Sequence, residues 1–560
     1  MTKFTIGRRL PALAVGMALI AAACGGTPAS PSASAGASAS GPTGGASSAP
    51  AGAPKLGGSI TAAIEGEPAS LDPAFSYDFV SGLAVSSITE PLLKFCENDQ
   101  KLCPNLAESW EVSPDGLTYT LKIRQGVKFH DGSVMTVEDV LFSLERVRDP
   151  ALGSYVGWML AKVKEVTAPD PATVVITLSE PDALFEYALA ATAAHIVSKK
   201  FVEANGDKYG KPEVGSIGTG PFTFVEWKSG DSQQLARFDD YWNKADGGPY
   251  LDAITIKIIA EPTTRVAGLQ TGDIDFIINN IPSDQYETVK AIQDVSLTFT
   301  DSYYGEWMTF DTKKAPFDNV KVRQALNYAF DKKAVRELFY GADAAPTKGT
   351  LVNPSLWTFE QAAWQAAWDQ LPAYDVDLVK AKQLLDESGV ADQLNGKEIA
   401  YYDSTPSIKG AAEAFIDAMS KLGITIKARK VTYQENVALQ FGTHDDYDIL
   451  VASWGSDFPD PSGNLRPNFA SENIAAGGAN SSAYENKQVD ELLAKQNTLV
   501  DKAERAKLLI EAQKIIAEDS AVIVTAYPGW PLAVNKRLAG FSISSLWYWA
   551  SLFKDAYVVE

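Results

Sequence analysis

A strand that runs into a loop with two carboxylates is the clearest place for chemistry in this sequence. Residues 447–454, YDILVASW, have the composition of a buried strand, and Asp457 and Asp460 follow it closely. Ligands of open α/β sheets bind beyond the carboxyl ends of strands, so a site is expected at this junction. A carboxylate there can hold an ammonium group through a charge-assisted hydrogen bond. Both aspartates stand among turn-forming residues, and from the residues alone an Asx turn is the simpler interpretation.

A pair of amides ends another expected strand, residues 273–280. Asn279 and Asn280 can each donate and accept hydrogen bonds, which suits binding of a polar ligand. The same pair also suits a turn before Pro282, and we give both interpretations equal weight.

Aromatic residues form a third group of candidates. Trp307 lies on the aromatic strand 303–310, where a tryptophan is more often part of the core than of a site. Residues 546–553, LWYWASLF, are also expected to pack in the core, although stacked tryptophans could bind sugar rings.

No enzyme motif competes with these binding features. The sequence has no G-x-S-x-G or H-E-x-x-H, and its three histidines are scattered at His130, His195 and His444, so we expect neither a catalytic site nor a metal. The Gly218-Thr-Gly220 segment is followed by Pro221 and not by a helix start, which argues against a nucleotide loop. We therefore predict a protein without catalytic activity and without a cofactor.

The composition indicates a large, acidic, folded protein. The chain has 560 residues, of which 46% are hydrophobic, enough for two or three packed domains. Its formal charge of -21 repels phosphate backbones, so nucleic acid is not expected as a partner.

The first 55 residues resemble an export signal followed by a tether. Residues 1–24 combine a basic start, an apolar run too short to span a bilayer, and the sequence Ala21-Ala-Ala-Cys24, which resembles a lipoprotein cleavage box with Cys24 as the lipidated residue. Residues 25–55 are almost entirely Gly, Ala, Ser, Thr and Pro, and a flexible chain of that length spans on the order of 30 Å. We expect a lipid anchor that holds a body starting near Leu56 at the cell membrane.

Two further cysteines flank an expected hairpin. Outside the cytoplasm Cys96 and Cys103 are expected to form a disulfide, and two unpaired thiols are the alternative.

The clearest sequence patterns for secondary structure lie between residues 105 and 147. Residues 117–123 alternate between apolar and polar side chains, as a half-buried strand does. Thr136 with Asp139 three positions later suits the start of a helix, and apolar residues then recur at helical spacing through Val147. From Asp375 onward the patterns of helices and strands alternate, which is typical of α/β folds.

Several separated segments resemble one family. They are residues 67–73 (EPASLDP), 106–147 (LAESWEVSPDGLTYTLKIRQGVKFHDGSVMTVEDVLFSLERV), 218–227 (GTGPFTFVEW), 272–275 (GDID) and 315–335 (APFDNVKVRQALNYAFDKKAV). In this order they resemble family 5 extracytoplasmic solute-binding proteins, the oligopeptide and dipeptide receptors of ATP-binding-cassette (ABC) importers.

The resemblance implies a two-lobed α/β fold with a hinge and an extra subdomain in the first lobe. By analogy the first lobe comprises residues 56–91, 217–304 and 524–560, the subdomain residues 92–216, and the second lobe residues 305–523.

The resemblance also implies roles for particular residues. Asp457 corresponds to the aspartate that holds the α-ammonium group of a peptide, and Trp454 would supply an apolar wall of the site. The remaining ligand-binding residues that it implies are Gly455, Asn279, Asn280, Trp307 and Tyr527.

The expected function follows from this family. The lobes would close on a short peptide, and the closed monomer would dock on permease subunits whose ATPases drive transport. Receptors of the same type also bind oligosaccharides, which is the main alternative. A peptide hydrolase or a sensor outside transport are alternatives from other classes.

Overall fold

The computed structural model describes residues 54–96, 101–279, 281–341, 344–444, 446–475, 478–541 and 543–559. They all belong to one compact unit, Gly44–Glu560. Asn280 and Cys24, which the sequence analysis singled out, lie outside the described residues.

A seven-stranded mixed sheet gathers strands from both ends of the chain. Its order is β10 (Phe222–Lys228), β11 (Ser232–Arg237), β12 (Ala253–Ile258), β1 (Ser59–Ile64), β13 (Phe276–Ile278), β20 (Trp530–Asn535) and β14 (Val295–Thr300). Helix α1 (Phe79–Ile88) packs on one face, while α5 (Pro262–Thr271) and α6 (Tyr286–Lys290) cover the other.

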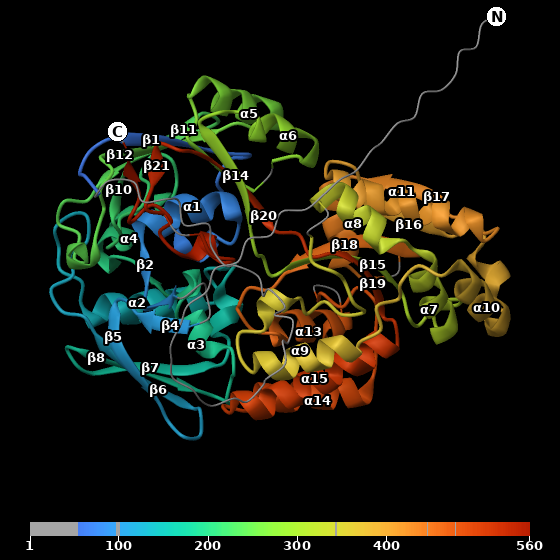
Figure 1. Cartoon of the computed structure of the whole chain (residues 1–560). Coiled ribbons are helices and arrows are strands. Elements are labelled where there is room, and N and C mark those ends of the chain that lie inside the picture. Colours follow the sequence, from blue (N-terminus) through green and yellow to red (C-terminus); the bar gives the residue numbers. More distant parts are fainter. Residues whose placement is uncertain are drawn as a thin grey trace, which may run out of the picture. The chain divides into compact units, whose positions relative to one another are not determined.

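A five-stranded sheet carries helices on both faces (Figure 1). Its order is β17 (Lys427–Val431), β16 (Glu398–Tyr402), β18 (Ile449–Gly455), β15 (Tyr304–Phe310) and β19 (Val522–Ala526). Trp307 faces a hydrophobic cluster with α9 (Gln361–Gln370), α13 (Ser462–Phe469), α14 (Lys487–Asn497) and α15 (Lys502–Glu518). The alternate residue Met308 faces α7 (Val320–Ala329), α8 (Lys332–Tyr340), α10 (Leu378–Ser388) and α11 (Pro406–Lys421). Helix α12 (Tyr433–Gln440) lies beside β18.

A smaller antiparallel sheet has its own hydrophobic cluster, which we call the small-sheet cluster. The sheet consists of β5 (Ala107–Val112), β6 (Thr118–Ile123), β8 (Thr173–Leu178) and β7 (Val163–Asp170). Helices α2 (Val137–Arg148) and α3 (Phe185–Ala188) contribute to this cluster, and α4 (Lys199–Asn205) packs beside α2. Three two-stranded pairs complete the strands: β2 (Glu90–Pro91) with β9 (His195–Ile196), β3 (Leu93–Cys96) with β4 (Lys101–Pro104), and β21 (Leu538–Ala539) with β22 (Tyr557–Val558).

The capping residues Thr136 and Asp139 and the apolar spacing after them correctly predicted the start of helix α2. Helix α2 begins after Thr136, whose backbone N–H and hydroxyl both donate to the Asp139 carboxylate at 2.9 Å. The preceding strand and the helix stripe place Leu121, Val140 and Leu144 in the small-sheet cluster. The predicted strand and the predicted capped helix are therefore confirmed.

Two short segments connect the large sheets. Residues 301–303 lead from β14 to β15, and residues 527–529 lead from β19 back to β20. The hydroxyl of Ser302 in one segment donates to the carbonyl oxygen of Pro528 in the other. Among the described residues, no helix is both long enough and apolar enough to cross a membrane.

Candidate functional site

Asp457 lies two residues beyond the end of β18 and contacts a residue from the other large sheet. The hydroxyl of Tyr77 donates to its two carboxylate oxygens, at 2.9 Å each. Tyr77 precedes α1, which packs on the seven-stranded sheet, whereas β18 belongs to the five-stranded sheet. This hydrogen bond therefore joins the parts of the chain built around the two large sheets.

The environment of Asp457 suits a positively charged partner. Burial raises the pKa of its carboxyl to about 7, and the hydrogen bond from Tyr77 acts in the opposite direction. Burial, followed by the charge of Asp457, raises the pKa of Tyr77 well above its ordinary value. No basic side chain of the described residues forms an ion pair with Asp457. A cationic group that reached this carboxylate would supply the missing opposite charge.

Phe458, the next residue, follows a strand of the five-stranded sheet, but its side chain is buried against the small antiparallel sheet. Only 3% of it is exposed, and it belongs to the small-sheet cluster. Its ring centroid lies 6.0 Å from that of Tyr187, 6.1 Å from Trp158 and 5.9 Å from Trp549. Sequence reasoning missed this contact, although an aromatic residue next to Asp457 in a loop was the available signal.

Asp460 anchors the other end of the loop. Its carboxylate accepts hydrogen bonds from Arg505 at 2.8 and 3.0 Å, and the exposed fractions of the two side chains are 0% and 2%. The backbone N–H of Ser462 also donates to it, at 2.9 Å. The Asx turn considered for both aspartates is therefore formed by Asp460, while the hydrogen bonds of Asp457 come from Tyr77.

Trp454 and Gly455 form the last two positions of β18. Trp454 is half-buried and its ring lies 5.5 Å from that of Phe441, while its buried indole N–H has no hydrogen-bond partner in the described part of the chain. Gly455 pairs with Tyr304, and a Cβ atom at Gly455 would lie 2.5 Å from the tyrosine ring. The close approach of the ring explains why this position needs glycine.

Two other predicted site residues lie in the hydrophobic cluster on the α9 face of the five-stranded sheet. Trp307 is 2% exposed and Tyr527 is 8% exposed. The hydroxyl of Tyr527 donates to the carbonyl oxygen of Thr350. In the described structure both side chains support the core, and their contact with a ligand stays a prediction.

The remaining predicted residues are dispersed. Asn279 has a positive φ of 61° directly after β13, and its backbone N–H donates to the carbonyl oxygen of Pro531 at 2.9 Å. Cys96 and Cys103 form a disulfide that joins β3 to β4, distant in sequence from the β18 loop.

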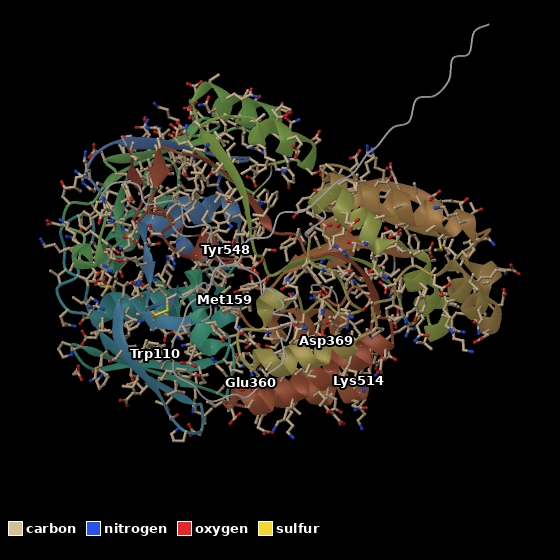
Figure 2. The ribbon with its side chains drawn as sticks, in the orientation of Figure 1. Trp110, Met159, Glu360, Asp369, Lys514 and Tyr548 are labelled. Atoms are coloured by element: carbon tan, nitrogen blue, oxygen red, sulfur yellow. A yellow bond between two sulfur atoms is a disulfide. The ribbon has the colours of Figure 1, made fainter. Side chains whose placement is uncertain are left out.

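The aromatic segment 546–553 packs as predicted. Trp547 and Trp549 are 4% and 3% exposed, and Tyr548 (labelled in Figure 2) packs edge-on against Phe79 with ring centroids 4.8 Å apart. Because both tryptophans are buried, this segment does not present stacked rings to a sugar.

Glu306 is a buried carboxylate that sequence reasoning also missed. It lies on β15, is 6% exposed, and accepts hydrogen bonds from Tyr340 at 2.7 Å and from Ser407 at 2.8 Å. Burial raises the pKa of its carboxyl, against the effect of these two hydrogen bonds. The available signal was a single acidic residue inside an aromatic strand.

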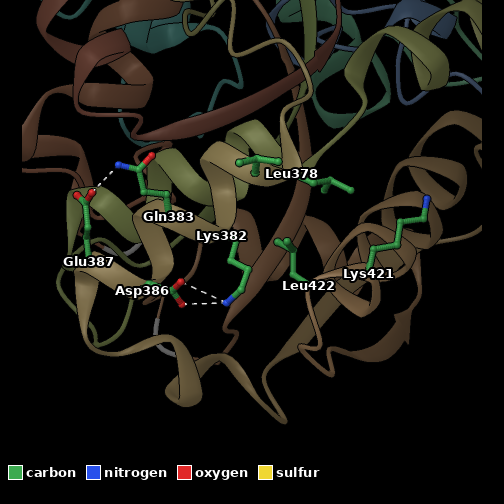
Figure 3. Close-up of a pocket in the computed structure, with 8 residues that line it drawn as sticks. Leu378, Lys382, Gln383, Asp386, Glu387, Lys421 and Leu422 are labelled. Carbon is green, nitrogen blue, oxygen red and sulfur yellow. Dashed lines mark hydrogen bonds and ion pairs between the residues drawn. The ribbon is translucent and has the colours of Figure 1, made fainter.

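A hollow of about 560 Å³ opens elsewhere, between α10 and the end of α11 (Figure 3). Its lining includes an ion pair between Lys382 and Asp386 at 3.1 Å and a hydrogen bond from Gln383 to Glu387 at 2.8 Å. Its other charged side chains are also paired, Glu387 with Lys321 at 3.0 Å and Lys421 with Asp417 at 2.7 Å. None of the predicted site residues lines this hollow. Among the described residues, no group of three or more His, Cys, Asp or Glu is arranged to hold a metal ion.

Comparisons with known proteins agree with the family that the sequence suggested. The model of the bacterial extracellular solute-binding proteins, family 5, matches residues 101–476. Heme-binding protein A of Haemophilus influenzae is 33% identical over 86% of this chain and 89% of its own length. The glutathione-binding protein GsiB of Escherichia coli K12 is 30% identical over 88% of this chain and 91% of its own length.

A solved structure extends the similarity to the fold. The periplasmic binding protein DppA of Helicobacter pylori, determined in complex with the peptide STSA, superposes with a TM-score of 0.75 at 27% identity, covering 90% of this chain and 99% of DppA. This similarity confirms the predicted α/β fold of the two-lobed binding-protein type. With the matched family model and relatives of at least 30% identity over most of the chain, this protein belongs to the family 5 bacterial extracellular solute-binding proteins.

Proposed function

We propose that this protein captures short peptides for an ABC importer and that Asp457 holds the α-ammonium group of the peptide. The observation that carries the proposal is the environment of Asp457: a partly buried carboxylate beyond the end of β18, without a basic partner among the described residues. The peptide bound to the similar DppA supports this ligand class.

The chemistry favours a free amine. An ammonium group donates hydrogen bonds to an ionised carboxylate and cancels its charge, whereas an acetylated amine keeps one N–H and no charge. A buried carboxylate left without a positive partner costs free energy, so the site would discriminate against blocked peptides. Trp454, whose indole N–H has no partner among the described residues, would line the site next to Asp457.

Closure of the two lobes would couple capture to transport. Tyr77 contacts Asp457 from the seven-stranded side, and Phe458 inserts into the small-sheet cluster, so the loop after β18 bridges parts of the chain that would separate in an open state. A ligand that contacts both sides favours the closed state in proportion to its differential affinity. The closed monomer would then dock on permease subunits.

The proposed location of the protein is the outer surface of the cell membrane, to which a lipid would anchor it. Cys24 would carry a lipid anchor, and residues 25–55 would act as the tether. The lobe boundaries would be those inferred from the family, and the hinge would be residues 301–303 and 527–529, which lie within a few residues of them. Peptide hydrolysis is not part of this function, in line with the named relatives, which are binding proteins.

The test compares trialanine with N-acetyl-trialanine by isothermal titration calorimetry. We expect the wild type to bind trialanine far more tightly than its acetylated form. Asp457→Ala should weaken trialanine binding by about 2–5 kcal/mol, since it removes one partner of a buried charge pair. Asp369→Asn, a change at an exposed aspartate on α9, serves as the control and should leave both affinities unchanged.

Equal affinity of wild type and Asp457→Ala for trialanine would remove Asp457 from the site. Absence of binding to any peptide, checked by native mass spectrometry of the purified protein and of ligands released from it, would remove the peptide proposal itself.

A further inference from the structure

Six carboxylate residues are more than nine-tenths buried in the described structure, and four of them have a basic partner. Arginine pairs with three of them and lysine with a fourth, and the pairs are Asp72 with Arg146, Asp275 with Arg537, Asp460 with Arg505, and Asp311 with Lys314. Glu90 accepts hydrogen bonds from three donors, Tyr241, Trp242 and Thr219. Glu306 has no basic partner, and only two donors, Tyr340 and Ser407, form hydrogen bonds to it.

The hydrogen bonds of Glu306 satisfy only one of its oxygens. Tyr340, at the end of α8, and Ser407, in the first turn of α11, both donate to Oε1. No described residue donates a hydrogen bond to Oε2, and Oε2 is not among the buried atoms sealed from solvent without a partner. One carboxylate oxygen therefore remains available to a group that enters from outside.

The charge of Glu306 acts on tyrosines from both large sheets. Tyr286 lies on α6, beside the seven-stranded sheet, while Tyr304 and Tyr402 lie on strands of the five-stranded sheet. Burial is the main cause of the raised pKa of each phenol, and the negative charge of Glu306 adds to it. A positive group next to Glu306 would therefore meet phenols as well as the carboxylate, and phenol rings can attract cations.

The register of the sheet relates Glu306 to Asp457. Glu306 pairs with Ser453 on β18, and Asp457 follows Ser453 by four residues. At ~3.3 Å per residue the α-carbons of Ser453 and Asp457 are at most ~13 Å apart, and with the step of ~5 Å between neighbouring strands those of Glu306 and Asp457 are on the order of 15 Å apart. Tyr304, which pairs with Gly455, lies between them on the same face of the sheet as Glu306.

We propose that Glu306 is a second cation-binding subsite of the same ligand site, and that the preferred ligand carries a second positive group within about 15 Å of its α-ammonium group. This inference rests on the proposed function, because Asp457 takes the first positive group. A peptide with a lysine or arginine side chain at its second or third residue has the required chemistry and reach. Such a ligand supplies the positive partner that the described structure does not give to Glu306.

The experiment measures the affinities of matched tripeptides by calorimetry. The probes are Ala-Lys-Ala and Ala-Ala-Lys, each compared with the peptide in which uncharged norleucine replaces lysine. In the wild type at least one lysine peptide should bind tenfold or more tightly than its norleucine match. In Glu306→Gln, which keeps an acceptor for Tyr340 and Ser407, this ratio should fall to about one, as expected when a charge pair is lost.

Glu413→Gln is the matched control, because Glu413 is an exposed glutamate on the same helix as Ser407. It should preserve the wild-type ratio. A thermal melt checks that Glu306→Gln folds. The comparison of lysine and norleucine peptides on the wild type stands even if that variant does not fold.

The outcomes separate the two proposals. If lysine and norleucine peptides bind the wild type equally, or if Glu306→Gln keeps the lysine preference, the Glu306 subsite is overturned while peptide capture stands. If no peptide binds but lysinamide or 1,5-diaminopentane binds and requires Glu306, peptide capture is overturned and the cation subsite stands. If none of these probes binds the wild type, both proposals are overturned.

Discussion

The phenol of Tyr77 donates to both carboxylate oxygens of Asp457, although the two residues are 380 positions apart in the sequence. The carboxylate belongs to the loop after β18, and the phenol precedes α1. A neutral hydroxyl therefore contacts a carboxylate that would bind a positive group more strongly. This relationship makes the charge state of Asp457 the property to test first.

Peptide binding should release a proton below neutral pH. The pKa of Asp457 is raised to about 7, so at pH 6 roughly nine tenths of the unliganded protein carries the proton, whereas an ammonium ligand requires the ionised form. Calorimetry in buffers of different ionisation enthalpy should give nearly one proton released at pH 6. Above pH 8 it should give net proton uptake, because Asp457 is already ionised and the free peptide amine, whose pKa is about 8, must gain a proton to bind as an ammonium group. Asp457→Asn should abolish the release, and an unchanged release in that variant would contradict the assignment.

The raised pKa of Asp457 also makes the stability of the fold depend on pH. Because the folded pKa lies above the ordinary value of 3.8, Asp457 favours the unliganded fold most at low pH, and this contribution is lost as the pH rises through about 7.

Tyr77→Phe should shift the midpoint of the pH dependence of peptide affinity to higher pH. The variant removes the donor that lowers the pKa of Asp457. A hydrogen bond to a charged group contributes about 1.5–3 kcal/mol, which corresponds to a shift of about one to two pH units. Affinities measured from pH 5 to pH 9 give the midpoint, and Tyr155→Phe, a change at another exposed tyrosine, is the control. A midpoint that stays at the wild-type pH would show that Tyr77 does not act on Asp457.

Phe458→Ala should weaken peptide binding through loss of the closed state. The ring packs in the small-sheet cluster while its backbone belongs to the β18 loop, so the closed form loses on the order of 3 kcal/mol of packing. Affinity by calorimetry and unfolding by urea should both be measured. Phe330→Leu, inside the cluster of the five-stranded sheet, should lower the free energy of unfolding and leave affinity unchanged. Equal affinity for Phe458→Ala and wild type would refute this coupling.

Arg505→Met should destabilise the fold by about 3–5 kcal/mol, because it leaves the buried carboxylate of Asp460 without its positive partner. The double variant Asp460→Asn with Arg505→Met contains no unpaired buried charge and should recover part of the loss. Urea unfolding followed by tryptophan fluorescence measures both. Equal losses in the single and the double variant would show that the ion pair is not the cause.

Cys24→Ser should release the protein from the membrane fraction of cells that express the full chain. The lipid requires the thiol of this residue, and the tether by itself has no apolar surface to bind a bilayer. Quantitative immunoblots of membrane and soluble fractions give the measurement. Thr27→Ser in the tether is the control, and retention of Cys24→Ser in the membrane fraction would contradict the anchor.

Local features of this protein were predictable from the sequence because they depend on residues a few positions apart. The alternation that gives β6 and the capping of α2 by Thr136 and Asp139 both act within one or two turns of chain. The segments that identify the family are also contiguous runs of residues, so the family and its α/β fold are predictable from the amino-acid sequence.

The environment of the candidate site depended on tertiary structure. Strand patterns place Trp307 and Glu306 on opposite faces of β15, but they do not say which neighbours each face meets. Glu306 meets Ser407, 101 positions away, and Phe458 is buried in a cluster formed mainly by residues more than 250 positions earlier. Burial and the pairing of charges arise only when such distant segments pack together, because each side chain loses its water to neighbours that the local sequence does not contain. For that reason the sequence by itself determined the family and the local elements, and only the fold decided which carboxylates remain without a positive partner.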